Sequence, residues 1–398
     1  MANNNENKVL NVPHLRFPEF NGEWETKLIN DLAVVIGGGT PDTTIKSYWD
    51  GEIQWFTPSE IGKNKYVDSS LRTITEEGLN NSSAKLLPPN TILLSSRATI
   101  GECSLSLREC ATNQGFQSLV SKKCYVDFLY YLIQTKKRDL IRKSCGSTFL
   151  EISANEVRKI QVSVPTDVEQ QKIAGLLSLI DERIATQNKI IEDLKKLKSA
   201  IIERHYNQAE KQTVFIADLG KPFNVGNLSK DDLSETGKPC IIYGELFTTY
   251  GETISQVESH TNKKEGMTLS KKGDLLFPTS TTVDAISLIA PSVINVDGVI
   301  LGGDMFGIHI STNFNAQYLS YYFNHIAKKQ FAKYAKGSTI IHLHYKDIEK
   351  AQLLLPCLVE QNKMAACLVL LDEKIRIESS HLQSVVKQKM YLLHQMFI

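Results

Sequence analysis

The sequence of 398 residues lacks the features of a membrane or exported protein. Its N-terminus, MANNNENKVL, has neither the basic nor the apolar region of a signal peptide, and no apolar run approaches the ~18 residues that span a bilayer. Seven cysteines form no C-x-x-C pair, so we expect reduced, mostly buried thiols and no metal site. The net charge is only +1, so any surface for a polyanion is local or shared with a partner. We therefore expect a cytoplasmic protein.

Two catalytic motifs are also missing from the sequence. There is no G-x-x-x-x-G-K-[ST] loop for a nucleoside triphosphate, and no Asn-Pro-Pro-Tyr or Asp-Pro-Pro-Tyr tetrad of the kind that holds a flipped adenine. A stand-alone methyltransferase or nuclease is the rival interpretation that these absences disfavour. We expect a chain that recognises a target while other proteins carry out the chemistry.

A tandem duplication organises the sequence. Residues 165–184 overlay residues 356–375 at a constant offset of 191, with 11 identities in 20 positions and no gap. The same offset relates Gly146-Ser147-Thr148 to Gly337-Ser338-Thr339. At ~100 to 200 residues per domain, the length predicts two to four domains, and the repeat divides the chain into two equivalent halves.

Each repeat contains a segment of about forty residues without proline, which predicts a long helix of roughly 60 Å. In both, apolar residues step alternately by three and four, the spacing of a helix–helix seam. The predicted seam residues are Leu177, Ile180, Ile184, Ile191, Leu194, Ile201, Leu368, Leu371, Ile375, Leu382, Val385 and Leu392. An antiparallel pair would bury both seams and place the preceding domains at opposite ends, although the sequence alone leaves a parallel pair open.

Polar residues interrupt the two seams at matching positions, Gln187 with Glu378 and Lys198 with Lys389. Our hypothesis is that they set the register and orientation of the helices. The alternative is that they lie at the seam edge with their polar groups in water.

The segments outside the helices show short strand-like runs and turn signals, typical of mixed α/β domains. We predict an α+β fold with two duplicated mixed domains and two long antiparallel coiled-coil helices, related by a pseudo-twofold axis. The expected boundaries are 1–160 for the first domain, 161–212 for the first helix, 213–352 for the second domain and 353–398 for the second helix.

Several motifs in this order resemble one protein family. They include the Ser-Ser-Arg-Ala-Thr-Ile-Gly run from Ser95, Ala111-Thr-Asn-Gln-Gly-Phe-Gln117, the doubled Pro-x-x-Val-Glu-Gln-x-Lys helices and Gly337-Ser-Thr-Ile-Ile-His-Leu. The pattern resembles the specificity subunit of type I restriction-modification systems over nearly the whole chain. In the last motif, Ile340 and Ile341 stand where the family more often has a polar Gln-Lys pair.

The resemblance implies two target-recognition domains, each reading one half of a bipartite double-stranded DNA sequence. It also implies that the helices bind two methyltransferase subunits and, through them, restriction and translocase subunits. S-adenosylmethionine, ATP and Mg²⁺ are then expected on the partner subunits and no cofactor on this chain. A coiled-coil adaptor with protein-binding domains is the alternative.

DNA recognition needs cations for phosphates and hydrogen-bonding side chains near base edges. Arg97 is the first candidate for a guanine contact, and a structural ion pair is the alternative role for it. The lysines and arginines before each Gly-Ser-Thr turn are candidates for phosphate contacts. The alternative for these residues is that they form a solvated helix face. The full set of predicted DNA contacts is Thr40, Trp55, Ser59, Arg97, Gln114, Lys137, Arg142, Lys143, Ser147, Thr148, Tyr243, Thr279, Thr281, Lys329, Lys333, Lys336, Ser338, Thr339 and His342.

Overall fold

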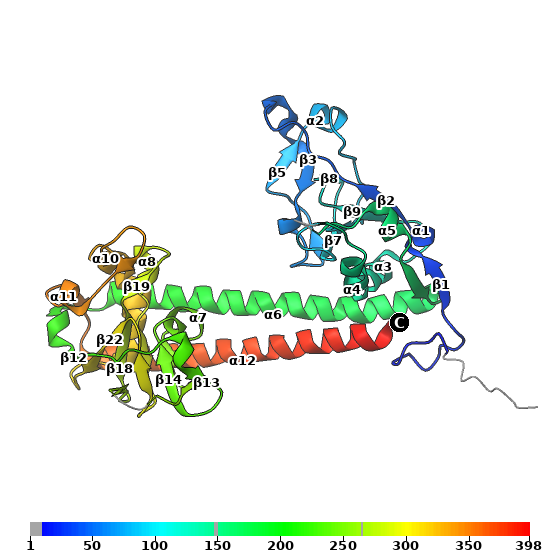
Figure 1. Cartoon of the computed structure of the whole chain (residues 1–398). Helices are drawn as coiled ribbons and strands as arrows, with labels where there is room; N and C mark the ends of the chain where they lie inside the picture. Colours follow the sequence, from blue (N-terminus) through cyan, green and yellow to red (C-terminus); the bar gives the residue numbers. More distant parts are fainter. Residues whose placement is uncertain (1–9, 147–149, 264–265) are drawn as a thin grey trace, which may run out of the picture. The chain divides into compact units, whose positions relative to one another are not determined.

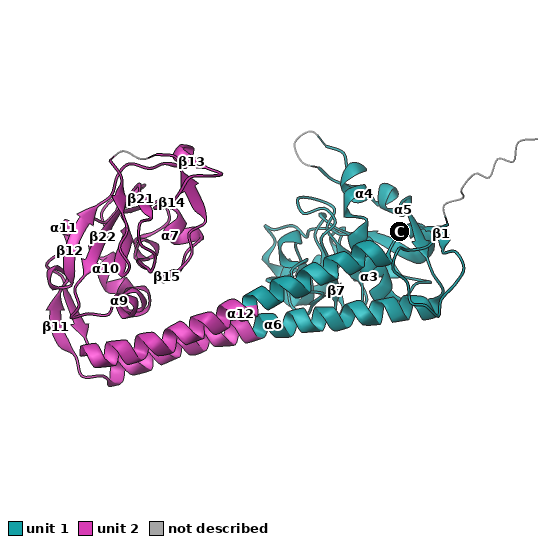
Figure 2. Cartoon of the chain, turned by 90° about the horizontal axis from the view of Figure 1, so that it is seen from below, with its two compact units in different colours: residues 1–189, 379–398 teal, residues 190–378 magenta. Residues whose placement is uncertain are grey.

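The computed structural model describes residues 10–146, 150–263 and 266–398, in two compact units. Unit 1 comprises residues 1–189 and 379–398, and unit 2 comprises residues 190–378 (Figure 2). The boundary cuts two long helices, α6 (Asp167–Gln208) and α12 (Leu358–Met396), which are labelled in Figure 1. Both helices therefore contribute residues to both units.

The first domain, the part of unit 1 outside the long helices, is built on two mixed sheets. The larger has the order β2-β9-β6-β7-β4, antiparallel except for the parallel edge pair β4 and β7. The smaller has the order β5-β3-β8, with β3 and β8 parallel. The strands are β2 (Ala33–Gly37), β3 (Trp49–Phe56), β4 (Tyr66–Val67), β5 (Arg72–Ile74), β6 (Ile92–Leu94), β7 (Cys103–Ser106), β8 (Cys110–Thr112) and β9 (Gln117–Ser121).

A further ribbon joins the start of the first domain to the start of α6. Strand β1 (Glu25–Leu28) pairs antiparallel with β10 (Gln161–Val164), which directly precedes the helix. The short helices of the domain are α1 (Ile29–Leu32), α2 (Glu76–Asn80), α3 (Val126–Thr135), α4 (Lys137–Arg142) and α5 (Ala154–Arg158), with 3-10 turns η1 (Lys46–Tyr48) and η2 (Pro58–Glu60).

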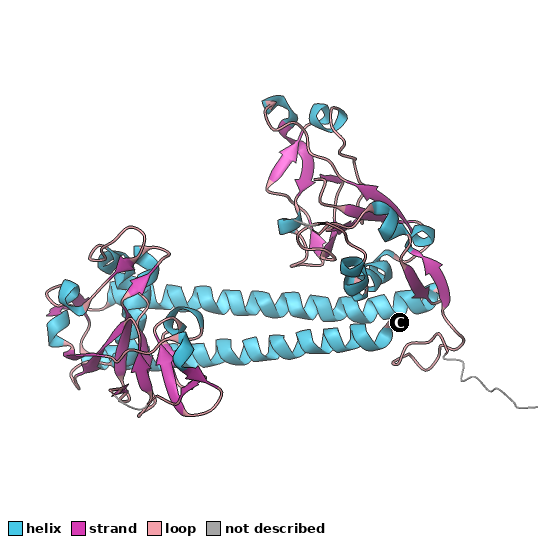
Figure 3. Cartoon of the chain, in the orientation of Figure 1, coloured by secondary structure: helices cyan, strands magenta, loops and turns pink. Residues whose placement is uncertain are grey.

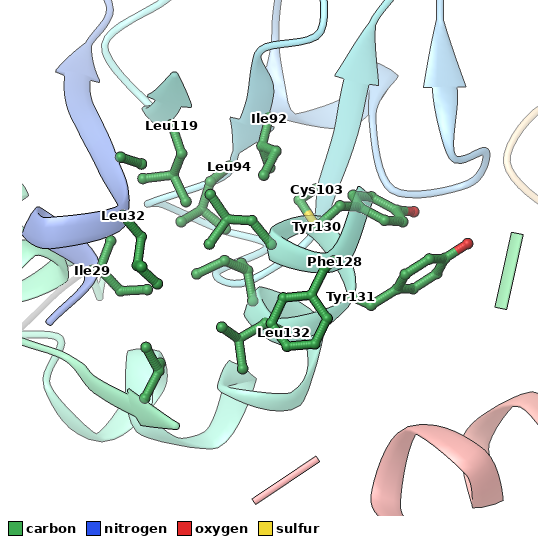
Figure 4. Close-up of a cluster of buried hydrophobic side chains, with 14 of the residues drawn as sticks. Ile29, Leu32, Ile92, Leu94, Cys103, Leu119, Phe128, Tyr130, Tyr131 and Leu132 are labelled. Carbon is green, nitrogen blue, oxygen red and sulfur yellow. The ribbon is translucent and has the colours of Figure 1, made fainter. Parts of the chain in front are cut away.

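Helix α3 is the hydrophobic centre of the first domain because six consecutive residues, 128–133, are buried. They pack with Leu32, Leu94 and Leu119 in a cluster that also includes Leu177 of α6. In Figure 4 the hydroxyl oxygens of Tyr130 and Tyr131 point away from the cluster. The aromatic helix thus provides apolar surface to the sheet and polar atoms at the margin of the core.

The second domain, the part of unit 2 outside the long helices, repeats the strand order of the larger sheet, whereas its other sheet has five strands in place of three. The sheet β12-β22-β18-β20-β15 again ends in a parallel edge pair, β15 and β20, and a second sheet β13-β16-β14-β21-β17 contains the parallel pair β14 and β21. Two-stranded ribbons join β11 to β24 and β19 to β23. The strands are β11 (Gln212–Phe215), β12 (Gly220–Asn224), β13 (Leu233–Ser234), β14 (Lys238–Ile242), β15 (Thr253–Ile254), β16 (Ser259–Thr261), β17 (Thr268–Leu269), β18 (Asp274–Pro278), β19 (Ser280–Thr281), β20 (Ser292–Ile294), β21 (Ile300–Gly302), β22 (Met305–Ile310), β23 (Ile341–His342) and β24 (Gln352–Leu355).

The helices of the second domain are short as well (Figure 3). The aromatic helix α9 (Ala316–Tyr322) corresponds to α3 and runs into a π-helical turn, η5 (Phe323–Ala327). The others are α7 (Glu245–Thr248), α8 (Ala285–Leu288), α10 (Lys328–Ala332) and α11 (Tyr345–Ile348), with 3-10 turns η3 (Ile216–Asp218) and η4 (Lys230–Asp232).

In each unit the two long helices pack antiparallel. In unit 1, Asp181 of α6 meets Lys389 of α12, and in unit 2, Lys198 of α6 meets Asp372 of α12. The fold is therefore the predicted α+β class, with two duplicated mixed domains and two long antiparallel helices.

Two details differ from the sequence-based expectations. Gln161–Val164, expected in the first helical segment, is strand β10, and residues 353–355, expected in the second, belong to strand β24. Their partners, β1 and β11, lie far away in the sequence. The thiols are free, as expected, but Cys145, Cys357 and Cys367 are exposed, so the expectation of mostly buried cysteines is only partly met. Burial raises the pKa of Cys103 to about 12, which makes that thiol unreactive.

Candidate nucleic-acid interface

The twelve apolar seam residues predicted from the sequence all lie in the buried or half-buried faces of α6 and α12. Of the polar residues between them, Gln187 and Lys198 are 6% exposed, and Glu378 and Lys389 are half-buried. These four side chains therefore do not extend into water. The cross-helix ion pairs of the two lysines instead support the interpretation that they set register.

A polar side chain fastens the start of each long helix to its domain. The Gln170 amide donates to Pro165 O (2.9 Å) and accepts from the backbone N–H of Tyr125 (2.9 Å), the residue before α3. Gln361 repeats both bonds in unit 2, with Pro356 O (2.8 Å) and the N–H of Asn315 (3.0 Å) before α9. This is the structural role of the repeated Val-Glu-Gln motif.

In the first domain, Arg97 lies in a strained loop after strand β6. Its guanidinium donates to Glu151 Oε2, and the following Ala98 has a φ of 61°, an unusual value for a residue with a Cβ. The ion-pair alternative for Arg97 is therefore present in the structure. Because both side chains are more than a third exposed, the pair leaves Arg97 accessible to a phosphate or base.

The remaining predicted contacts of this domain fall into two groups. Thr40 donates to Gln114 Oε1, and with Ser59 these residues are partly or fully exposed, so they can reach a ligand. Trp55 instead is 4% exposed and donates its indole N–H to Gly39 O (2.9 Å), which places its side chain in the core. Ser147 and Thr148 lie outside the described residues.

The basic residues of α4 and its surroundings are mostly tied to acidic neighbours. Lys137 pairs with Glu102, Arg142 with Asp139 and Lys143, more loosely, with Glu156 (3.8 Å). All three are surface pairs of low strength, so a phosphate could compete for each cation. Burial lowers the pKa of the neighbouring Lys136, whose ammonium donates to Ile398 O (2.6 Å).

In the second domain, a cavity of about 780 Å³ gathers several predicted contacts. Tyr243, Thr281 and His342 line it, together with Asp304 and Lys328, which is one of the lysines before the Gly337 turn. The cavity forms where β23 pairs with β19, so the loop after Gly337 and the end of β18 meet. Aromatic, hydroxyl and cationic groups here suit contact with a nucleic acid.

Thr279 directly precedes Ser280, which lines this cavity. Thr279 is 7% exposed, and its backbone N–H donates to Asp304 O (2.8 Å). Its side chain is therefore placed in the core, like that of Trp55.

The segment from α10 to β23 carries the exposed cations of the second domain. Lys329 and Lys333 are exposed, as are Ser338 and Thr339 in the following turn. Lys336 is exposed but forms an ion pair with Asp347, and its hydrogen bond lowers the pKa of that carboxyl. The His342 ring stacks on that of His344 at 6.0 Å between centroids.

Sequence reasoning missed the aromatic contacts of one cation. The guanidinium of Arg72 lies 3.5 Å from the centroid of Trp49, a cation–π contact. Arg72 and Trp49 come from the antiparallel strands β5 and β3, whose pairing no local signal in the sequence reveals.

In the part of the chain that the structure describes, no helix is long and apolar enough to cross a membrane. The same residues contain no group of three or more His, Cys, Asp or Glu side chains that could hold a metal ion.

The sequence was compared with models of known protein families and with known proteins. The sequence model described as Type I restriction modification DNA specificity domain matches residues 21–196 and 208–388. The Type I restriction enzyme MjaIX specificity subunit of Methanocaldococcus jannaschii is 39% identical over 180 residues, 44% of this chain and 42% of that protein. The EcoR124I/EcoR124II specificity subunit of Escherichia coli is 30% identical over 221 residues, 54% of this chain and 52% of that protein. The matched part thus spans about half the length of these relatives.

A solved structure has the same fold over almost the whole chain. The type I restriction-modification S subunit from M. genitalium superposes with a TM-score of 0.61 at 15% identity, covering 97% of this chain and 99% of that one. The two family matches cover both repeats, each with its domain and most of its long helix. The chain belongs to the family of type I restriction-modification DNA specificity proteins.

Proposed function

We propose that this chain is the DNA sequence-specificity subunit of a type I restriction-modification complex, and that each domain reads one half of a bipartite target. The observation that carries the proposal is the repetition of one strand topology with different side chains at the candidate contacts. Arg97, Thr40 and Gln114 present one set of hydrogen-bonding groups, whereas Tyr243, Thr281 and His342 present another. One frame with two sets of loop residues suits two half-sites of different sequence.

The long helices act in this proposal as the spacer between the half-sites. Helix α6 has 42 residues, which at 1.5 Å per residue is about 63 Å. Two readers that engage one face of a duplex must be separated by about a helical turn, ~34 Å, or more, and the bases between them go unread. The length of the helices thus determines the gap.

The helices also supply docking sites for two methyltransferase subunits, which in turn bring restriction and translocase subunits. Exposed apolar side chains at equivalent positions of the two repeats support this: Val168 and Val359 are 67% and 60% exposed, and Leu179 and Leu370 are 64% and 69% exposed. Apolar side chains repeated on two solvent-facing helix surfaces are typical of partner contacts. Two equivalent surfaces suit two copies of one partner.

The chain itself performs no catalysis in this proposal. S-adenosylmethionine, ATP and Mg²⁺ bind to the partner subunits. This chain determines where on the DNA those subunits act. Phosphate contacts from the exposed lysines add affinity that decreases as salt rises.

A gel-shift experiment tests the function. The full chain, assembled with its methyltransferase subunits, is expected to bind a duplex that carries both half-sites, which methylome sequencing of the source cell would supply. Binding should weaken as salt rises and should be lost when either half-site is scrambled. Sequence-indifferent binding, or none, would overturn the proposal and favour a coiled-coil adaptor with protein-binding domains.

A heptad insertion tests the spacer role separately. Seven residues added to both α6 and α12 at the centre of the helix pair keep the seam in phase and are expected to lengthen the unread gap while both half-sites stay the same. A changed half-site with an unchanged gap would contradict the spacer role.

A further inference from the structure

A Tyr–Asp–Lys triad attaches the first domain to the helix pair. Both carboxylate oxygens of Asp181 in α6 have a partner: Oδ1 forms an ion pair with Lys389 of α12 (2.7 Å), and Oδ2 accepts a hydrogen bond from the hydroxyl of Tyr131 (2.6 Å). Tyr131 belongs to α3, and its side chain is fully buried. Three elements therefore meet at one carboxylate.

The same triad recurs in unit 2. Asp372 of α12 accepts from Lys198 of α6 on Oδ1 (2.7 Å) and from the hydroxyl of Tyr321 on Oδ2 (2.6 Å). Tyr321 belongs to α9 and is 1% exposed. The ammonium of Lys198 also lies 4.8 Å from the Tyr321 ring centroid, as that of Lys389 lies 5.6 Å from the Tyr131 ring.

Each triad combines both repeats. The tyrosine and the aspartate come from the repeat that builds the local domain, whereas the lysine comes from the other repeat. The two contacts to each aspartate therefore form together only when both long helices and the domain are in one arrangement.

A second attachment lies eleven residues away on the same helix. Gln170 fastens the residue before α3, and Gln361 fastens the residue before α9. Eleven residues of helix are about 16 Å, close to three full turns, so both attachments lie on one helix face. Two attachments on one face fix the rotation of a domain as well as its place along the helix.

The triads contribute more to geometry than to stability. Burying an ion pair costs desolvation energy that the attraction between the charges barely offsets. Apolar residues of equal size would often stabilise the fold to the same extent. Apolar contacts such as that of Leu177 tolerate small sliding, whereas a hydroxyl–carboxylate bond of 2.6 Å does not. A slip of one residue, about 1.5 Å, would break the bonds to both oxygens.

We propose that Tyr131, Asp181 and Lys389, and their counterparts Tyr321, Asp372 and Lys198, are positioning residues that fix the orientation of each domain on the helix pair. The inference rests on the proposed function in one respect. If the chain binds two half-sites, the triads determine how strongly binding discriminates against a gap of the wrong length. They do not contact bases, so they leave the sequence of each half-site unchanged.

The test uses Tyr131→Phe and Tyr321→Phe, which remove one hydroxyl each and keep the rings. Tyr130→Phe is the matched control, because Tyr130 is the neighbouring buried tyrosine of α3, 4% exposed, and is not part of the triad. The full chain with its methyltransferase subunits is titrated with duplexes whose half-sites are intact and whose gap is native, one base pair shorter or one base pair longer. The readout is the ratio of the dissociation constants for altered and native gaps.

We expect each triad variant to reduce this ratio about tenfold, equivalent to roughly 1.4 kcal/mol, and the Tyr130→Phe variant to keep it. A defect in folding alone would weaken binding to all three duplexes equally and leave the ratio unchanged. An unchanged ratio in both triad variants would overturn the inference.

A second measurement separates this inference from the proposed function. Hydrogen exchange of the free chain is expected to quicken in α3 for Tyr131→Phe and in α9 for Tyr321→Phe, but not in α3 for Tyr130→Phe. If exchange quickens in the triad variants but the unaltered protein does not bind bipartite DNA, the proposed function is overturned and the attachment role is kept. Unchanged exchange in both triad variants would overturn the attachment role.

Discussion

The two domains place opposite charges at one equivalent position beside the helix pair. Lys65 directly precedes β4, and its ammonium contacts Asp127 (2.5 Å) and Ser178 Oγ (2.7 Å). Glu252 directly precedes β15, the corresponding edge strand, and its carboxylate contacts Lys198 (3.1 Å) and His325 (2.8 Å). The reversal shows that the duplicated frame tolerates either charge when a neighbour compensates it.

What stays the same between the domains is also informative. The order of strands in the larger sheet, the glutamine attachment and the Tyr–Asp–Lys triad recur, while the charges around them change. The repeated parts connect backbone and helices, whereas the variable parts lie at edges and loops. Perturbing matched residues in the two units therefore tests which features are shared.

The largest expected effect is that of replacing Lys198. Its replacement by Met leaves two carboxylates, Asp372 and Glu252, without its ammonium, and we expect a decrease of about 3–5 kcal/mol in the free energy of unfolding. Lys389→Met removes the partner of one carboxylate, Asp181, and should cost less. Urea unfolding of the full chain measures both.

The exposed Lys196, paired with Glu192 on the helix surface, provides the control. Lys196→Met is expected to change stability by less than about 0.5 kcal/mol. Equal decreases for the Lys198 and Lys389 variants would contradict the difference between the two units.

The next effect concerns pH. Burial alone would raise the pKa of Glu252, but hydrogen bonds from His325 and Lys198 and the charge of Lys198 lower it to about 2. A depressed carboxyl pKa stabilises the fold above the unfolded value of about 4.5, and this contribution is lost as pH falls toward 2. The shift corresponds to about 3 kcal/mol.

Glu252→Gln is therefore expected to flatten the decline of stability between about pH 4.5 and 2 relative to the unaltered chain. Unfolding free energies measured across this range provide the comparison. Parallel curves for the two proteins would show that Glu252 does not titrate in this way.

A smaller and equal effect is expected at the glutamine attachments. Gln170→Leu and Gln361→Leu each leave a buried carbonyl and a backbone N–H without a partner, which should cost about 2 kcal/mol. Thermal unfolding measures both variants, with the exposed Gln171→Leu as control. A large difference between the two units would argue that the attachments are not equivalent.

The smallest effect on stability is expected for the exposed lysines of the second domain. Replacing Lys329 and Lys333 by Gln should leave unfolding nearly unchanged. The slope of log affinity for DNA against log salt should decrease by about 0.9 for each phosphate that is no longer neutralised by a lysine. An unchanged slope would show that other cations of the chain neutralise the phosphates.

The helices and the duplicated order of elements could be predicted because periodicity and repetition are local signals. The aromatic runs of α3 and α9 were visible in the same way, as Phe128-Leu-Tyr-Tyr-Leu-Ile and Tyr318-Leu-Ser-Tyr-Tyr-Phe. The repeat also gave the matching positions of Lys198 and Lys389, although not their partners. Those partners lie on another element, which no periodic pattern specifies.

The exposure of the candidate contact residues was predicted less well than the helices, because exposure depends on tertiary packing. Trp55 and Thr279 have residue types that suit DNA contacts, yet strand pairing places both in the core. Arg97 forms its ion pair with Glu151, which lies more than fifty residues away in the sequence. An ion pair could therefore be named as an alternative, but its acidic partner could not be identified. The triads were missed because Tyr131 and Tyr321 read as ordinary core aromatics.

The π-helical turn η5 accounts for a small irregularity in the repeat. Tyr131 and Tyr321 are 190 residues apart, whereas Gly146 and Gly337 are 191 apart, so the second domain has one additional residue between these points. A π turn holds one more residue than an α turn, and η5 lies within this interval. An insertion taken up inside a helix leaves the downstream glycine at the same offset of 191 as the long helices, so the two copies can diverge in length without disturbing the repeat that follows.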